Sequence, residues 1–291
     1  MLKQTLDRLY AEFNAPDTAA DPIHLVRRYA AANDREAVGF IAASLAFGRV
    51  TSVLQSIARV EAIMGPSPAA YIREFDFRRE AKRFAAVGHR WIRGRDLVAL
   101  LWLMRQMIDR CGSIERFFVA TRANPDADMR SMLESFSSRA LALDVRSAGV
   151  RYFFPRPSAG SACKRLNLFL RWMVRRDRLD LGVWTDVAPS QLVIPLDTHV
   201  IRVGRCLRLT RYSTPGWRMA EDITACLRRF DASDPVKYDF ALCHLGMMYP
   251  GSSALEARLG RFKITDRRSS PARAPARART PPPSRRPSVR R

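Results

Sequence analysis

The chain has 291 residues, of which 47% are hydrophobic, and its 50 Lys and Arg against 28 Asp and Glu give a formal charge of +22. This length predicts one large domain or two lobes, and the apolar content is enough for a core, which excludes a chain that is disordered or fibrous as a whole. The charge points first to a polyanionic partner. No apolar run reaches the roughly 20 residues of a membrane span, and Lys3 is followed by a polar helical pattern instead of a secretory signal, so we expect a cytoplasmic protein.

The first half of the chain is predicted to be helical. Asp21 and Pro22 are typical of a helix start, with a capping residue followed by proline in the first turn. Further along, apolar side chains recur at the spacing of one helix face. The helices expected from this spacing are 34–47, a more polar helix that ends near Gly65, 95–110, and two shorter helices within 113–144 that are separated around Asn124-Pro125.

The second half contains two stretches without helical periodicity. Residues 149–163, GVRYFFPRPSAGSAC, are aromatic and then rich in Pro, Gly and Ser, which predicts a loop between helices. Residues 177–197 are irregular, with short strand-like pieces at most. Neither an internal repeat nor a run of alternating strands is present, so the predicted fold class is all-α. The helices expected here are 164–175, Val200 to Leu207, 215–229, and Asp234-Pro235 to about Met248.

Residues 266–291 differ in composition from the rest of the chain. From Arg267 to Arg291 there are nine Arg, no Lys and no acid, among Pro, Ala and Ser. Such a segment cannot bury enough apolar surface to offset the entropy of ordering it, so we predict a disordered tail. The tail could bind nucleic acid nonspecifically, or it could be a dispensable extension. Residues 1–265 remain basic without it and are expected to form a domain of two helical lobes.

Metal and cofactor chemistry is not expected. The five cysteines are scattered and never spaced as CxxC, which is typical of a reducing compartment and gives no support for a disulfide framework, a four-cysteine iron–sulfur cluster or a zinc ribbon. The four histidines do not have the spacing of metal ligands. The GxxxxGK[ST] pattern of a P-loop and the GxSxG pattern of a serine hydrolase are also missing from the sequence.

Two segments combine residue types that support chemistry. In the first, small residues from Gly160 to Cys163 predict a loop whose backbone N–H groups can approach phosphate oxygens, and Lys164 follows in the first turn of a helix. In the second, PLDTHVIRV, Asp197 stands at a helix start, where the amides favour an ionised carboxylate. Simpler roles stay open, because Lys164 could only contact solvent or phosphate and Asp197 could only cap its helix.

These segments resemble the signature of the helix-hairpin-helix DNA glycosylases, the superfamily of endonuclease III and 8-oxoguanine DNA glycosylase. In that signature a glycine-rich hairpin ends in a lysine and a helix that reads K-T-A-N, and a later segment reads V-D-T-H-V-x-R-V. Here KRLN begins at Lys164 and LDTHVIRV begins at Leu196. The segments SACKRLNLFLRWMVR, IPLDTHV and DPVKYDFAL resemble more closely a bacterial family of unknown function within this superfamily, from about Asp21 to Gly246.

Three features depart from the superfamily pattern. Ala162 replaces the second glycine of the hairpin. Lys164 and Asp197 are 33 residues apart, which is longer than in endonuclease III and similar to the archaeal 8-oxoguanine glycosylases. The C-terminal iron–sulfur cysteines are absent from the sequence, as in several branches of the superfamily.

The resemblance implies a two-lobed, base-excision repair DNA glycosylase with AP-lyase activity on a damaged base such as an oxidised purine. The hairpin would hold the DNA backbone, and the damaged nucleotide would flip into a cleft between the lobes. Lys164 would attack C1′ of the sugar and displace the base, and the Schiff base that follows would allow strand cleavage. Asp197 would stabilise the positive charge on the sugar or help to deprotonate the lysine. Helices within about 34–240 would form the DNA-binding lobe, and the terminal helices would complete the second lobe.

A larger set of residues is expected near the DNA because it belongs to the two segments or flanks them. The resemblance places Arg49, in the turn Phe47-Gly48-Arg49, where a residue fills the gap left by a flipped base. The arginines that follow the loop are either a solvated helix face or phosphate contacts, and the flanking aromatic residues either stack on the base or belong to the core. The expected DNA contacts are Gly160, Ser161, Ala162, Cys163, Arg165, Arg49, Arg171 and Arg175. The candidates for the base pocket are Phe153, Phe154 and Trp184.

Two functions are therefore weighed. An enzyme is preferred because Lys164 and Asp197 occur together, and binding alone does not need a carboxylate beside DNA, which opposes binding electrostatically. The alternative is a helix-hairpin-helix protein that binds nucleic acid without base chemistry. An RNA-directed protein has no support from an RNA-module signature. The expected partner is double-stranded DNA with a damaged base, bound by a nucleoid-associated monomer without metal or cofactor.

Overall fold

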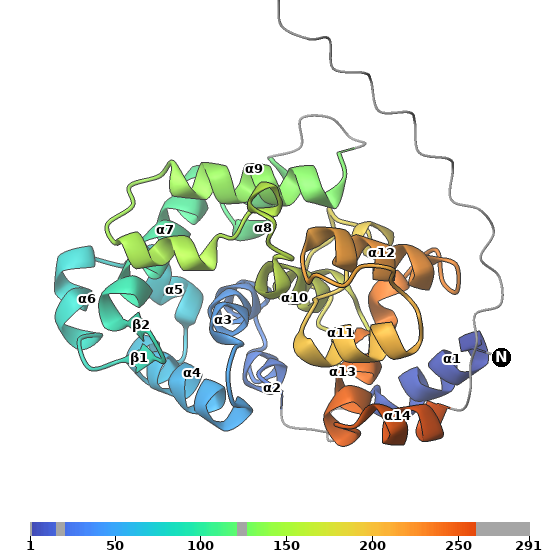
Figure 1. Ribbon diagram of the computed structural model, residues 1–291. Coiled ribbons are helices and arrows are strands. Elements are labelled where there is room, and N and C mark those ends of the chain that lie inside the picture. The colour runs from blue at the N-terminus through green and yellow to red at the C-terminus, as the bar shows by residue number, and fades with distance from the viewer. Residues whose placement is uncertain (1, 16–20, 121–126, 260–291) are drawn as a thin grey trace, which may run out of the picture.

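The computed structural model describes residues 2–15, 21–120 and 127–259, and these ranges are mainly helical, as the sequence predicts (Figure 1). Within them the only sheet is a short two-stranded hairpin. None of the helices described is long and apolar enough to cross a membrane. The predicted tail 266–291 lies outside the described residues.

The middle of the chain forms one group of helices around α7 (Gly94–Cys111). This helix is buried over most of its length, and it contacts α5, α6 and α8. Its middle turns, Leu97 to Met104, are buried on nearly all sides, which explains why this part of its sequence is apolar throughout. The helices of this group are α4 (Val50–Met64), α5 (Pro68–Arg73), α6 (Phe77–Arg83), α8 (Ile114–Val119) and α9 (Met129–Leu141).

A β-hairpin that the sequence analysis did not anticipate lies between α6 and α7. Its strands are β1 (Gly88–His89) and β2 (Ile92–Arg93), and Arg90 in the turn has a positive φ of 55°. His89 is buried, and its Nε2 donates to the carbonyl oxygen of Phe47 at 2.8 Å. This bond fixes the hairpin to the turn that follows α3.

The first and the last helices of the described residues form a second group, on the opposite side of α3 from α6 and α7 (Figure 1). In it α13 packs against both α1 and α11, while α12 contacts the 3-10 helix η5. Because α11 and α12 pack here, this group begins after about residue 197, earlier than the division near residue 240 that the resemblance implied. The elements are α1 (Leu2–Phe13), α11 (Thr198–Cys206), α12 (Trp217–Arg228), η5 (Pro235–Tyr238), α13 (Asp239–Met248) and α14 (Ser252–Leu259).

Three helices lie between the two groups: α2 (Ile23–Arg27), α3 (Ala32–Leu45) and α10 (Lys164–Val174). α10 packs closely on α3 at Gly39, where the terminal methyl of Met173 lies 2.8 Å from the position that a Cβ atom would take. The rings of Phe40 and Phe169 meet edge to face across the same contact, with centroids 5.0 Å apart. This central pair fixes where α10 begins, and α10 begins at Lys164.

Most of the predicted helices match the observed ones to within a few residues. Residues 177–197 are irregular, as predicted, apart from an isolated β-bridge between Arg176 and Leu181 and the 3-10 helix η4 (Pro189–Gln191). The last predicted helix differs at its start. It begins as η5 and becomes α-helical at Asp239. Asp234 does not cap it, because both carboxylate oxygens accept from Nε of Arg175, at 2.8 and 3.0 Å.

Candidate functional site

The loop of small residues lies directly before α10. Gly160 is exposed and has a φ of +80°, and Cys163 also has a left-handed backbone, with a φ of +50°. The loop is held from within, because Oγ of Ser161 accepts from the amide of Cys163 at 3.1 Å and the side-chain amide of Asn167 donates to the carbonyl of Ala162 at 3.1 Å. Its shape is therefore set before any ligand arrives.

The segment before this loop is not an α-helix. It consists of two 3-10 helices, η2 (Ala148–Phe153) and η3 (Pro157–Ala159). Pro155 and Pro157 oppose an α-helix here, because proline removes a backbone donor and clashes with the preceding helical turn. The stretch predicted as a loop between helices therefore contains two short 3-10 helices and no α-helix.

Lys164 is the first residue of α10 and is partly buried. Its Nζ donates to the carbonyl oxygen of Ala46 at 3.0 Å. Ala46 is the C-terminal cap of α3, where the last carbonyls of a helix lack partners within the helix and can accept such a bond. The lysine therefore points along the surface to the turn between α3 and α4.

Asp197 is the N-cap of α11, as predicted. Its Oδ1 accepts from the amides of His199 and Val200, both at 2.8 Å, and its Oδ2 accepts from the thiol of Cys243 at 3.1 Å. Three donors fix the orientation of the carboxylate.

Lys164 and Asp197 act on the same two side chains of α13. Burial raises the pKa of Asp239 to about 6 against the opposing charge of Arg171, and Asp197 raises this pKa further while Lys164 lowers it. Burial also raises the pKa of the Cys243 thiol, as do Asp197 and Asp239, and Lys164 again opposes the shift. The lysine and the two carboxylates thus form one electrostatic cluster, where α13 contacts α11 through Cys243 and Asp197 and contacts α10 through Asp239 and Arg171.

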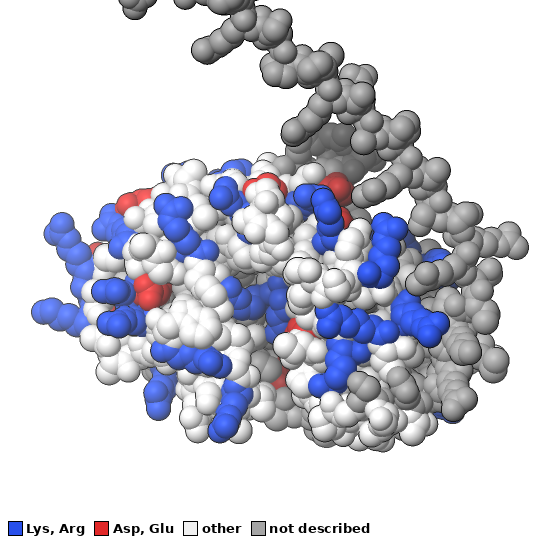
Figure 2. Space-filling view, in the orientation of Figure 1, with Lys and Arg blue, Asp and Glu red and all other residues white. Residues whose placement is uncertain are grey.

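The face that carries this junction is basic and hollowed. Figure 2 shows a hollow in the middle of the face, in front of the place where α3 meets α10 in Figure 1. Lys and Arg side chains lie on its floor and an acidic side chain lies at its edge, and further Lys and Arg surround it. A hollow with this charge suits a polyanion.

The structure corrects two of the predicted DNA contacts, Arg171 and Arg175. They are only 2% and 3% exposed and cannot reach a phosphate on the surface. Arg171 donates to Asp239 at 2.5 Å and to Asp180 at 3.1 Å, and Arg175 pairs with Asp180 and with Asp234. Buried charges need such partners, so these arginines belong to an internal ion-pair network.

The predicted base pocket is also wrong. Phe153, Phe154 and Trp184 are buried in the core, with 1%, 2% and 4% of their surface exposed. Phe154 packs between other aromatic rings, and Nε1 of Trp184 donates to Oε1 of Glu36 at 2.9 Å. No face of these rings is open to a base.

Two further predicted contacts are turned inward. Arg165 donates to the carbonyls of Ser44, at 3.0 Å, and Tyr152, and burial lowers its pKa to about 10. Cys163 is 1% exposed, and burial raises the pKa of its thiol to about 12. Arg165 and Cys163 therefore tie the loop to the body of the protein. The predicted contacts that retain exposed or partly exposed surface are Gly160, Ser161, Ala162, Arg49 and, in part, Arg165.

The sequence analysis missed two features of this site. The first is the pair Asp239 and Cys243. The feature of the sequence that could have indicated this pair is an acidic residue in a mainly apolar helix. The second is Trp91, which forms an aromatic cluster with Phe47 and with Tyr152, one of the aromatic residues beside the loop that could stack on a base; we call these three rings the Trp91 cluster. Its signal was the short stretch GHRWIRG between two helices, where a tryptophan stands among arginines.

Within the described ranges, no group of three or more His, Cys, Asp or Glu is arranged to hold a metal ion. Comparison with curated proteins and with solved structures gave no match. The family model described as "Protein of unknown function (DUF2400)" matches residues 21–248, which run from just before α2 to the end of α13 and include both Lys164 and Asp197. The match covers most of the chain, and the protein therefore belongs to this family.

Proposed function

We propose that the protein is a DNA glycosylase with AP-lyase activity, in which Lys164 is the nucleophile and Asp197 stabilises the positive charge that develops on the sugar. The observation that carries the proposal is the cluster at the junction of α10, α11 and α13. There a partly buried lysine and a fixed carboxylate act on the same neighbours, Asp239 and Cys243. A binding protein gains nothing from a carboxylate at this place.

In the proposed reaction the unprotonated amine of Lys164 attacks C1′ of the damaged nucleotide. The C1′–N bond breaks, the base leaves with the electron pair and takes up a proton, and the nitrogen of the lysine loses one. Ring opening gives a Schiff base, and loss of a proton from C2′ then breaks the bond to the 3′ phosphate. The lysine must first leave the carbonyl of Ala46, which its flexible side chain allows.

Asp197 contributes through its fixed position. The oxocarbenium character of the sugar develops while the base leaves, and a carboxylate already held by the amides of His199 and Val200 stabilises it without reorganising. The loop in front of the first turn of α10 offers the backbone amides of Ser161 and Ala162 for a phosphate oxygen beside the lesion, while the amide of Gly160 donates to the carbonyl of Pro157 at 3.0 Å.

The test is borohydride trapping on duplexes that carry 8-oxoguanine, uracil, thymine glycol or an abasic site. The wild type is compared with Lys164→Ala and with Lys82→Ala, a matched control on α6 whose lysine is exposed. We expect a covalent adduct for the wild type and Lys82→Ala and none for Lys164→Ala. An adduct of equal yield in Lys164→Ala would overturn the role of this lysine.

The second candidate function is a nucleic-acid-binding protein without base chemistry. The observation that favours it is that Lys164 and Asp197 both have hydrogen-bond partners inside the protein, as residues with a purely structural role would. Duplex binding in a gel-shift assay, without base release or adduct on any substrate, would select this candidate.

A further inference from the structure

We infer that the Trp91 cluster is a stacking platform for an unpaired nucleobase, so that the ligand is DNA in which a base has left the duplex next to the reaction site. The identity of the polymer rests on the proposed function. The platform itself is argued from the exposure, support and charge of the three rings.

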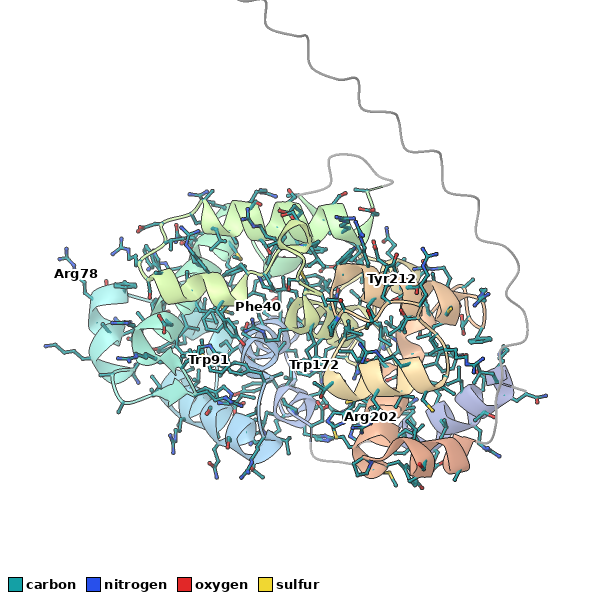
Figure 3. All side chains as sticks on the ribbon, viewed as in Figure 1. Phe40, Arg78, Trp91, Trp172, Arg202 and Tyr212 are labelled. Atoms are coloured by element: carbon teal, nitrogen blue, oxygen red, sulfur yellow. The ribbon has the colours of Figure 1, made fainter. Side chains whose placement is uncertain are left out.

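Trp91 is the most exposed aromatic side chain of the described residues, with 55% of its surface open to solvent. It stands in the turn of the β1–β2 hairpin, and Figure 3 shows it there beside α3. The other tryptophans of the chain are buried or partly buried. An apolar ring left in water on a tight turn, where a polar residue would serve, indicates a contact surface.

The exposed ring has firm support. The centroid of Phe47 lies 4.8 Å from that of Trp91 at an interplanar angle of 33°, and Tyr152 meets Trp91 edge to face at 5.4 Å. Tyr152 and Phe47 are in contact as well, at 5.3 Å. Because His89 anchors the hairpin to Phe47, the indole is held in place before a ligand binds, which reduces the entropy lost on stacking.

The charge around the cluster selects a nucleic acid as the occupant. The charged side chains that lie against these rings are arginines, with Arg165 beside both Tyr152 and Phe47. The guanidinium of Arg90 lies 5.2 Å from the centre of the Trp91 ring, and its Nη1 fills the space beside Gly48. Aromatic faces flanked by cations bind a base and its phosphate at once, and this pairing is typical of single-stranded nucleic-acid sites.

The cluster is also joined directly to the proposed nucleophile. Lys164 donates to the carbonyl of Ala46, and Phe47 is the next residue in the chain. On the other side, the guanidinium of Arg165 lies 3.7 Å from the centre of the Tyr152 ring and 5.6 Å from that of Phe47. A base that stacks on Trp91 would therefore belong to a nucleotide close to the one that Lys164 attacks.

The experiment measures the affinity of the full chain for two fluorescein-labelled DNAs, an intact duplex and the same duplex with one unpaired base. The variants are Trp91→Ala, Trp91→Phe and the matched control Trp102→Phe, whose partly buried indole also has an arginine beside it. We expect Trp91→Ala to lose about tenfold in affinity for the unpaired-base duplex and little for the intact one. Trp91→Phe should keep most of the affinity but lose the quenching of tryptophan fluorescence that binding causes in the wild type.

Equal affinity of the wild type and Trp91→Ala for both DNAs, with no quenching at Trp91, would overturn the platform. If Lys164-dependent adducts still form in that case, the proposed glycosylase stands without it. Stacking at Trp91 without any adduct would leave the platform intact and contradict the glycosylase. A wild type that binds neither DNA would overturn both, and the occupant of the platform would then have to be a protein surface.

Discussion

The thiol of Cys243 donates a hydrogen bond of 3.1 Å to Oδ2 of Asp197 and so connects α13 to the first turn of α11. The other oxygen of the carboxylate is already held by two backbone amides. Cys243 therefore stops the carboxylate from turning about its Cβ–Cγ bond. In the proposed reaction it is a positioning residue, because it acts on the sugar only through Asp197.

The first prediction concerns this bond. Cys243→Ala should reduce the single-turnover rate of adduct formation by about tenfold, because a hydrogen bond to a charged group is lost. Cys243→Ser should stay close to the wild type, since its hydroxyl can donate to the same oxygen. The rates are measured at saturating protein, with thermal unfolding as the control for folding. Equal rates in the wild type and Cys243→Ala would remove Cys243 from the mechanism.

The second prediction separates structural arginines from DNA-binding ones. Arg171→Ala should lower the free energy of unfolding by about 3 to 5 kcal/mol, because Asp239 would remain buried without its cation and Asp180 would keep only Arg175. Arg49→Ala, at an exposed N-cap, should leave the free energy of unfolding nearly unchanged and reduce the slope of log affinity against log salt by about 1. Urea unfolding and fluorescence anisotropy measure the two quantities. A stable Arg171→Ala with weakened DNA binding would show that the arginine faces the ligand after all.

The positions of Lys164 and Asp197 in the fold were predictable because both depend on local sequence. A small-residue loop before an apolar helical pattern locates the first helix start, and an aspartate followed by a helical pattern locates the second. Arg171 and Arg175 were misplaced for the opposite reason. Their main partner Asp180 comes from the irregular segment, and their burial follows from packing that no local pattern encodes.

The burial of the aromatic residues could not be predicted from local sequence either. Phe153 and Tyr152 are adjacent, yet the first is buried in the core and the second lies at the surface beside Arg165. Successive side chains of a 3-10 helix point in directions that differ by a third of a turn. Which of two adjacent residues is buried therefore depends on how η2 packs against the rest of the protein. The hairpin that presents Trp91 was missed because each of its strands has two residues, which is too short for an alternating pattern.

The third prediction concerns the loop before α10. A Cβ atom at Gly216 would lie 2.9 Å from the carbonyl oxygen of Gly160, so Gly216→Ala must displace the loop. We expect a several-fold loss of affinity for duplex DNA and a small change in stability.

The control is Gly65→Ala, where a positive φ of 76° makes alanine unfavourable but no atom lies within 4 Å of the added Cβ. It should lose about 1 to 2 kcal/mol of stability and bind DNA normally. Equal DNA affinity of both variants would show that the loop does not contact DNA.

The fourth prediction is a pH dependence that comes from Asp231. Burial raises the pKa of this carboxyl, but hydrogen bonds from Lys237 at 2.7 Å, from the hydroxyl of Ser233 at 2.7 Å and from the amide of Asp234 at 3.0 Å outweigh it and hold the pKa below its usual 3.8. These bonds fix the turn before η5, whose Tyr238 in turn donates to Asp7 of α1 at 2.7 Å.

A pKa that is lower in the folded protein means that folding favours the ionised carboxylate, so its contribution to stability is complete above the unfolded pKa of 3.8 and is lost as the pH falls through the folded value. Asp231→Asn should therefore be less stable than the wild type by about 1 kcal/mol at pH 7. Because every other acid titrates equally in both proteins, the difference between their free energies of unfolding isolates Asp231. Urea unfolding from pH 7 to pH 2.5 should show this difference shrink below pH 4, and a difference that stays constant or grows toward acid would contradict the role of the carboxylate in holding η5.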